Sequence, residues 1–168
     1  MEINARSCII RALMELMEIK SYDDITVSEI CDRAGYNRIS YYRNFTSKED
    51  ILTQMLNTIT KEFQSGMVLH RGEYFASSAA RMFEFMKTYH KQLMMLHSAR
   101  MDYILLEALN TAFYHTIPED TTYSRYDRAF QSGGYFYVVL KWMESGMKES
   151  TEEMGKILAD IVENSTIK

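Results

Sequence analysis

Four basic side chains lie close together within residues 33–48, a segment that contains no acidic residue. They are Arg33, Arg38, Arg43 and Lys48, in a chain whose net charge is −4. Aromatic rings at positions 36, 41, 42 and 45 are interleaved with them. Guanidinium, ammonium and phenol groups in this pattern are suited to contact the phosphates and base edges of a nucleic acid. A solvated charged surface without a ligand is the alternative interpretation.

Signals for two short helices frame this segment. Thr26-Val27-Ser28-Glu29 has the spacing of a capping box, so a helix is expected to begin at Val27. Gly35 is placed to end that helix in a left-handed conformation, and Asn37 can cap a second helix over about residues 38–43. Two short helices joined by a glycine-containing turn are the layout of a helix-turn-helix, whose second helix enters the major groove of DNA.

Residues 25–52, ITVSEICDRAGYNRISYYRNFTSKEDIL, resemble the N-terminal domain of the tetracycline-repressor (TetR) family of transcriptional regulators. The usual run in that family has the form T-V-x-x-I-x-x-x-A-G-V-s-x-x-t-x-Y-x-H-F-x-x-K-x-x-L. The matching residues are Thr26, Val27, Ile30, Ala34, Gly35, Tyr42, Phe45 and Lys48, and Leu52 lies one position after the final leucine of this form. Tyr36, Ile39 and Asn44 depart from it on or beside the second helix, so the departures bear on base preference rather than on the fold.

The resemblance and the residue chemistry together predict a set of DNA contacts. Thr26, Tyr42 and Asn44 are expected to contact phosphates, and Lys48 adds charge at the start of the following helix. The candidates for base edges begin with Arg38, which can donate two hydrogen bonds to one guanine. Ile30 and Phe45 are expected in the core. The predicted DNA-binding residues are Thr26, Arg38, Ser40, Tyr41, Tyr42, Asn44 and Lys48.

Enzymatic arrangements are not found in the sequence. The four histidines, at positions 70, 90, 97 and 115, form no Glu-x-x-His or His-x-x-x-His pair, and the chain has no phosphate-binding glycine loop and no nucleophile elbow. We therefore expect no catalytic residue, no metal and no cofactor. The two cysteines, Cys8 and Cys31, fit neither a disulfide framework nor a zinc site and are expected as reduced core residues.

Helical periodicity dominates the elements that must position these residues. Apolar side chains recur three and four residues apart, while one proline and seven glycines are too few for a turn-rich sheet protein. The fold class is all-α, with about nine helices: a three-helix DNA-binding domain at residues 1–48, then a helical dimerisation and effector domain at 49–168. Without a signal peptide or a run long enough to cross a bilayer, the chain is expected in the cytoplasm, with no membrane partner.

A pair of helix-internal glycines predicts a dimer interface. Gly133-Gly134 lies in a run with helical patterning, where each glycine costs about 1 kcal/mol against alanine, and close approach of a second copy would offset that cost. A kink with packing inside one chain is the alternative. The segment from Gly133 to Leu158 also resembles, through Trp142, Gly146 and an acid-rich last helix, a short-chain subset that includes dihydroxyacetone-kinase regulators. The predicted interface residues are Gly133, Gly134, Tyr137, Val138, Ile157 and Ile161.

Family resemblance implies an effector pocket in the helices between residues 50 and 125. Methionine and aromatic side chains are frequent there and could line a flexible apolar cavity, although such residues are more often plain core. The candidate lining residues are Phe63, Phe83, Met86, Tyr89 and Phe113.

These observations favour a homodimeric, effector-responsive repressor that binds a palindromic site on double-stranded DNA, with a small molecule as a possible further partner. The alternative is a co-regulator whose C-terminal bundle binds a protein or a metabolite and whose N-terminal domain binds DNA weakly or not at all. Salt-dependent binding to a two-fold symmetric DNA site distinguishes the two.

Overall fold

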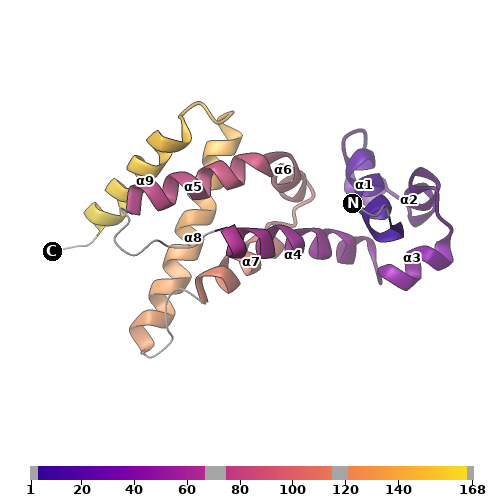
Figure 1. Cartoon of the computed structure of the whole chain (residues 1–168), viewed down its shortest axis with the longest axis horizontal. Coiled ribbons are helices and arrows are strands. Elements are labelled where there is room, and N and C mark those ends of the chain that lie inside the picture. The colour runs from indigo at the N-terminus through magenta and orange to yellow at the C-terminus, as the bar shows by residue number, and fades with distance from the viewer. Residues whose placement is uncertain (1–3, 67–74, 115–120, 166–168) are drawn as a thin grey trace. The chain divides into compact units, whose positions relative to one another are not determined.

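The computed structural model describes residues 4–66, 75–114 and 121–165. Nine α-helices, a short 3-10 helix and no strand lie within these residues, which confirms the all-α prediction (Figure 1). The chain divides into two compact units, and each is described by itself. The first unit holds the described residues of Met1–Thr58 and Lys91–Leu105, and the second those of Ile59–His90 and Leu106–Lys168.

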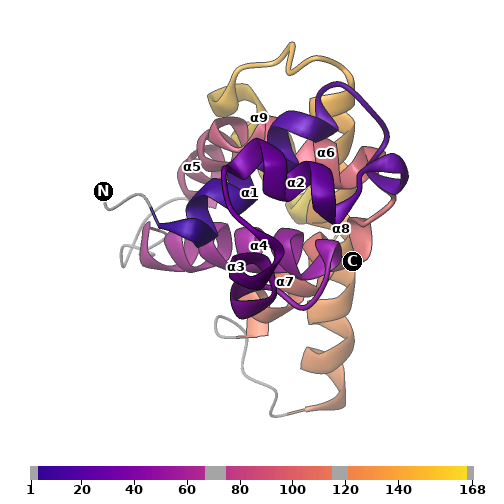
Figure 2. The ribbon, with the colours of Figure 1, turned by 90° about the vertical axis from the view of Figure 1, so that its right-hand side faces the viewer.

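Three short helices and the start of a fourth make up the N-terminal part of the first unit. α1 (Ala5–Met17) is followed by the 3-10 helix η1 (Tyr22–Asp24), then by α2 (Val27–Ala34) and α3 (Arg38–Asn44), and α4 (Lys48–Gly66) begins in this unit. Figure 2 looks onto α1, α2 and α3, which lie together. The predicted bounds of α2 are confirmed, and α3 is one residue longer than expected.

The core of the first unit forms where α1, α2 and α3 meet the first turns of α4. Ile9, Leu13, Ile30, Phe45 and Leu52 are each at most 1% exposed. Burial of this apolar surface is the main force that holds such short helices, which are marginal alone in water. The predicted core positions of Ile30 and Phe45 are confirmed. So are those of Cys8 and Cys31, both buried free thiols; burial raises the pKa of the Cys31 thiol.

A distant segment completes the first unit. α6 (His90–Ser98) and α7 (Asp102–Tyr114) supply residues 91–105 to it. Lys91 forms an ion pair with Glu18 just after α1, and the Tyr103 hydroxyl hydrogen-bonds to Glu49 in the first turn of α4. The compact unit therefore differs from the domain of residues 1–48 expected from the sequence, because contacts far apart in the chain enlarge it. The functional division at residue 48 stays a prediction.

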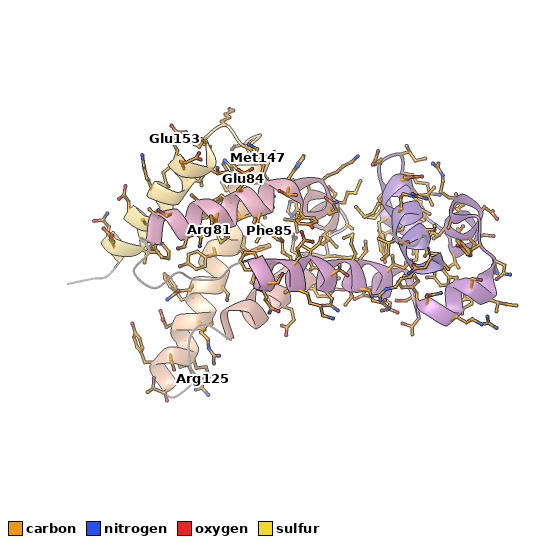
Figure 3. All side chains as sticks on the ribbon, in the orientation of Figure 1. Arg81, Glu84, Phe85, Arg125, Met147 and Glu153 are labelled. Atoms are coloured by element: carbon orange, nitrogen blue, oxygen red, sulfur yellow. The ribbon has the colours of Figure 1, made fainter. Side chains whose placement is uncertain are left out.

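Close packing of α5 (Phe75–Thr88) along α9 (Thr151–Ser165) organises the second unit (Figure 1). Gly155 makes this approach possible, since a Cβ there would lie 2.4 Å from the carbonyl oxygen of Ala76. Glu84, labelled on α5 in Figure 3, accepts a hydrogen bond from the Thr151 hydroxyl at 3.1 Å, where α9 begins. These contacts fix α9 against α5.

The long helix α8 (Thr122–Glu144) carries the second unit's largest buried ring. Trp142 is 3% exposed and meets Phe83 of α5 edge-on at 5.3 Å between ring centroids. Its indole nitrogen donates to the carbonyl oxygen of Glu149 at 3.0 Å, which ties the end of α8 to the connection before α9. Among the described residues, no helix has both the length and the apolar character needed to cross a membrane.

Candidate nucleic-acid interface

A reciprocal capping box sets the start of α2, as the sequence predicts. The Thr26 hydroxyl accepts from the backbone N–H of Glu29 at 3.3 Å, and the Glu29 carboxylate accepts from the Thr26 N–H at 2.8 Å. The Lys20 ammonium donates to the same carboxylate at 2.7 Å. That hydrogen bond, followed by those from Thr26, lowers the pKa of Glu29 to about 2. Thr26 is exposed, so its predicted phosphate contact is sterically open and stays a prediction.

The turn between α2 and α3 depends on two residues. Gly35 has φ 73° and ψ 27°, a left-handed conformation that glycine adopts without steric cost. Asn37 caps α3 by accepting from the backbone N–H of Ser40 at 2.9 Å through its side-chain oxygen. Both features match the prediction from the sequence. Together they determine where α3 begins and how it leaves the turn.

Burial along α3 defines an inner and an outer face. Tyr41 is 0% exposed and Phe45, one turn later, is 1% exposed, so the helix packs on the core along this edge. Ile39 and Tyr42 are 65% and 62% exposed. The residues that face outward are Arg38, Ile39, Tyr42 and Arg43, and we call them the outer face of α3.

The prediction that Tyr41 reads base edges is wrong. Its ring is buried between the helices and lies 6.1 Å from the ring of Phe45 and 5.0 Å from that of Tyr42. Burial is the largest of the causes that raise the pKa of the Tyr41 phenol to about 12. A base in the major groove cannot reach a side chain with no exposed surface, so Tyr41 is a core residue.

Ser40 and Asn44 lie between the two faces and are half-buried. The Asn44 amide donates to the Ser40 carbonyl oxygen at 2.7 Å, and Gln54 of α4 donates to the Asn44 carbonyl oxygen at 3.2 Å. These bonds secure the end of α3 to α4. Contacts from Ser40 and Asn44 to DNA stay predictions, at the edge of the outer face rather than at its centre.

Lys48 lies where α4 meets the start of α2, and its ammonium is engaged within the protein. Its Nζ donates to the carbonyl oxygens of Ile25 (2.6 Å), Tyr22 (2.9 Å) and Asp23 (3.4 Å). It also lies 4.6 Å from the centroid of the Tyr22 ring. A lysine has three N–H donors, so a phosphate would have to displace one of these acceptors. This geometry argues against the predicted phosphate contact and gives Lys48 a positioning role.

Two residues of the outer face, Ile39 and Arg43, were not among the predicted contacts. The signal for them is the spacing of Tyr41 and Phe45: two large rings four residues apart mark a buried edge, which leaves positions 39 and 43 opposite. Among the described residues, neither Arg38 nor Arg43 has an ion-pair partner, whereas Arg33 pairs with Glu15 at 3.2 Å. The outer face therefore carries two uncompensated positive charges.

The predicted dimer residues lie on an open surface of the second unit. Tyr137 is 68% exposed, while Ile157 and Ile161 of α9 are 40% and 45% exposed. Gly134 is exposed, Gly133 and Val138 are half-buried, and α8 runs through both glycines without interruption. A Cβ built at either glycine would meet no atom of the described residues within 4 Å. This argues against the alternative in which the glycines serve packing within one chain.

The candidate pocket residues fall into two clusters. Phe83 and Met86 are buried, with Phe83 against Trp142. Phe63 and Tyr89 instead share contacts with Phe85 of α5, at 5.2 and 5.0 Å between centroids. The Tyr89 hydroxyl donates to Glu62 at 2.6 Å, and this hydrogen bond is the main cause that raises the pKa of Tyr89 to about 12. The side chain of Phe113 lies outside the described residues.

Comparisons with known proteins agree with this architecture. The family described as "Bacterial regulatory proteins, tetR family" matches residues 9–55, and a "Transcriptional regulator C-terminal region" matches residues 46–164. No curated protein matches the sequence. A TetR transcriptional regulator from Streptococcus agalactiae has a similar structure, with a TM-score of 0.67, 16% identity, and coverage of 94% of this chain and 93% of that one.

Two further solved structures share the fold. The fatty acid degradation regulator FadR from Bacillus halodurans gives a TM-score of 0.62 at 16% identity, covering 96% of this chain and 95% of that one. The dihydroxyacetone kinase operon activator DhaS gives 0.59 at 13% identity, with the same coverages. The resemblance to dihydroxyacetone-kinase regulators thus has a structural counterpart, which at this identity shows a shared fold.

The N-terminal helix-turn-helix and the helical region that follows it both match family models of transcriptional regulators. Two family matches together span residues 9–164. The chain belongs to the TetR family and is a transcriptional regulator, not an enzyme.

Proposed function

We propose that this regulator reads duplex DNA with the outer face of α3 placed in the major groove. The observation that carries the proposal is the exposure pattern of α3, in which two arginines and a tyrosine face solvent opposite a fully buried edge. The chain is acidic overall, with a net charge of −4, so this concentration of positive charge is local. A local basic patch is the electrostatic footprint of a phosphate-binding surface.

Individual roles follow from position and chemistry. Arg38, the first residue of α3, can donate two hydrogen bonds to a guanine, because the N-terminal residues of a reading helix approach base edges. Tyr42 and Arg43 lie farther along the exposed side and are placed for phosphate oxygens. Thr26, Ser40 and Asn44 remain candidates at the margin of this surface.

The same proposal includes a homodimer, since one short reading helix specifies too few bases by itself. A second copy would present another α3 one DNA turn away, at roughly 34 Å. Because the two copies are related by two-fold symmetry, the DNA site would be palindromic. The surface that would join the copies carries exposed apolar side chains on two helices. They are Tyr126, Phe130 and Tyr137 of α8, and Ile157, Ile161 and Val162 of α9, between 37% and 72% exposed.

We further propose that the regulator is a repressor released by an effector in the second unit and that it acts in the cytoplasm, where operator DNA lies. A structure of Thermus thermophilus FadR, with the same fold at a TM-score of 0.51 and 17% identity, was solved in complex with lauroyl-CoA. For this chain the effector is a small molecule of unassigned chemistry. Regulation requires that it bind unequally to conformations with different separations of the two reading helices.

The experiment that tests DNA reading is selection of a binding site by the purified full chain, followed by affinity measurements across salt concentrations. Arg43→Ala should weaken all sequences alike and reduce the salt slope by about 1. Arg38→Ala should relax specificity at one position by about 1–3 kcal/mol. Arg33→Ala is the matched control, because it removes the same charge from an arginine already paired with Glu15. Selection of no sequence would favour the co-regulator interpretation.

The dimer is tested separately by sedimentation. Gly134→Leu places a branched side chain on the proposed interface and should yield monomers. Lys156→Leu adds the same side chain to an exposed position of α9 and should leave the dimer intact. Dimers that survive the first substitution would place the interface elsewhere.

A further inference from the structure

Ile39 is an exposed aliphatic side chain in the middle of a cationic surface. It is 65% exposed, while the isoleucines of the same unit's core, Ile9 and Ile30, are 0% exposed. Its helix neighbours on the outer face are Arg38, Tyr42 and Arg43. Contact of this branched apolar side chain with water is unfavourable. A ligand that covers Ile39 would remove that contact.

The backbone at Ile39 is held firmly. It is the second residue of α3, directly after the helix start that the Asn37 cap fixes. The buried ring of Tyr41, two residues on, prevents rotation of the helix about its axis. Isoleucine is β-branched, and in a helix one χ1 rotamer dominates, so its methyl groups are presented in nearly one orientation.

We propose that Ile39 recognises the 5-methyl group of a thymine in the major groove. This rests on the proposed function, namely that the outer face of α3 enters that groove. Thymine's methyl is the one apolar group that the bases present there, and aliphatic side chains pack against it. Cytosine offers an amino donor instead, which isoleucine cannot accept, so the contact selects thymine over cytosine at one position of each half-site.

The charges around Ile39 favour DNA over a protein as the occupant. The cores of protein interfaces are depleted in charged residues, whereas Ile39 is flanked on the helix surface by the two arginines Arg38 and Arg43. Their positive charge attracts a polyanion and disfavours a second copy of this same surface. A guanine edge for Arg38, a phosphate for Arg43 and a thymine methyl group between them would satisfy the two arginines and the isoleucine at once.

The test removes the methyl group from the DNA and the side chain from the protein. After site selection, each thymine of the operator is replaced in turn by deoxyuridine, which lacks only the 5-methyl group. The wild-type chain should lose about tenfold in affinity when one symmetric pair of thymines is replaced, and little at the others. Ile39→Ala should bind the thymine operator about as weakly as the wild type binds the uracil operator, and should no longer distinguish the two. Ile39→Val should retain most of the discrimination.

Several outcomes would overturn the inference. If no thymine replacement lowers affinity, or if Ile39→Ala still distinguishes thymine from uracil, Ile39 does not read the methyl group. Both results leave the proposed function intact, because the operator is still bound. If the chain selects no DNA sequence, the proposed function fails and this inference fails with it. Because Ile39 is exposed, thermal unfolding of Ile39→Ala should match that of the wild type, which excludes misfolding as the cause.

Discussion

The burial of Tyr41 leads to an unusual expectation, that removing its hydroxyl group stabilises the protein. The Tyr41 side chain has 0% exposure, and among the described residues its buried hydroxyl oxygen has no hydrogen-bond partner. A buried hydroxyl without a partner costs about 1–3 kcal/mol, because it has lost its bonds to water. Tyr41→Phe keeps the ring and gives up only the few dispersion contacts of one oxygen, at about 0.1–0.2 kcal/mol each.

We therefore expect Tyr41→Phe to raise the free energy of unfolding by about 1 kcal/mol. For a chain of this size that corresponds to an increase of about 2–4 °C in Tm, measurable by calorimetry or circular dichroism. Tyr42→Phe is the matched control, since its ring is 62% exposed and its stability should change by less than about 0.5 kcal/mol. Tyr41→Ala should cost about 3–5 kcal/mol through loss of the buried ring.

DNA affinity distinguishes a core role for Tyr41 from the base contact that the sequence predicts. If Tyr41 is a core residue, Tyr41→Phe binds the operator as tightly as the wild type. An operator affinity reduced tenfold or more, with Tm unchanged, would mean that the Tyr41 hydroxyl reaches the DNA. This edge of α3 would then not be buried in the core.

Further substitutions test the contacts that position the elements. Lys48→Met should lower the free energy of unfolding by about 2 kcal/mol, because three hydrogen bonds to carbonyl oxygens are lost. It should leave the salt dependence of DNA binding unchanged. A salt slope reduced by about 1 would show instead that Lys48 contacts a phosphate. The Glu29 carboxylate, with a pKa lowered to about 2 mainly by Lys20, stabilises the fold above its ordinary pKa of 4.5 and loses this effect as pH falls from there toward 2. In Glu29→Gln the free energy of unfolding should depend less on pH in that range. A pH dependence identical to that of the wild type would show that Glu29 does not cause it. Gly155→Ala should destabilise by about 1–3 kcal/mol, because its Cβ would lie 2.4 Å from a carbonyl oxygen of α5, whereas Lys156→Ala, at the next and exposed position of α9, should change the stability by less than about 0.5 kcal/mol. Equal effects of these two changes would contradict the close packing of α5 on α9.

The helix-turn-helix could be predicted from the sequence because its signals are local. A capping box spans four residues, and the left-handed turn requires one glycine, so Thr26, Glu29 and Gly35 determine the backbone without reference to the rest of the chain. The Asn37 cap is equally local. For this reason the bounds of α2 and α3 differ little from those expected.

Which way α3 faces could not be predicted by the same means. A seven-residue helix has fewer than two turns, so its pattern of residues is short. Tyr41 and Tyr42 are the same residue type, yet they are 0% and 62% exposed. Only the packing of Tyr41 on the core decides between them. That residues 91–105 belong to the first unit could not be predicted either, because this depends on contacts between residues far apart in the sequence, such as the ion pair of Lys91 with Glu18, 73 positions away.

The path of the chain bears on how an effector could control DNA reading. The polypeptide passes between the two units at three places, after Thr58, after His90 and after Leu105. Each crossing is covalent, and two of them lie within helices, α4 and α7, which transmit displacement along their axes more stiffly than a loop does. The segment between the second and third crossings is held to the first unit by Lys91 and Tyr103. In the regulation that we propose, a ligand bound in the second unit would act on the first through these three connections, and it would have to bind two states of the protein unequally.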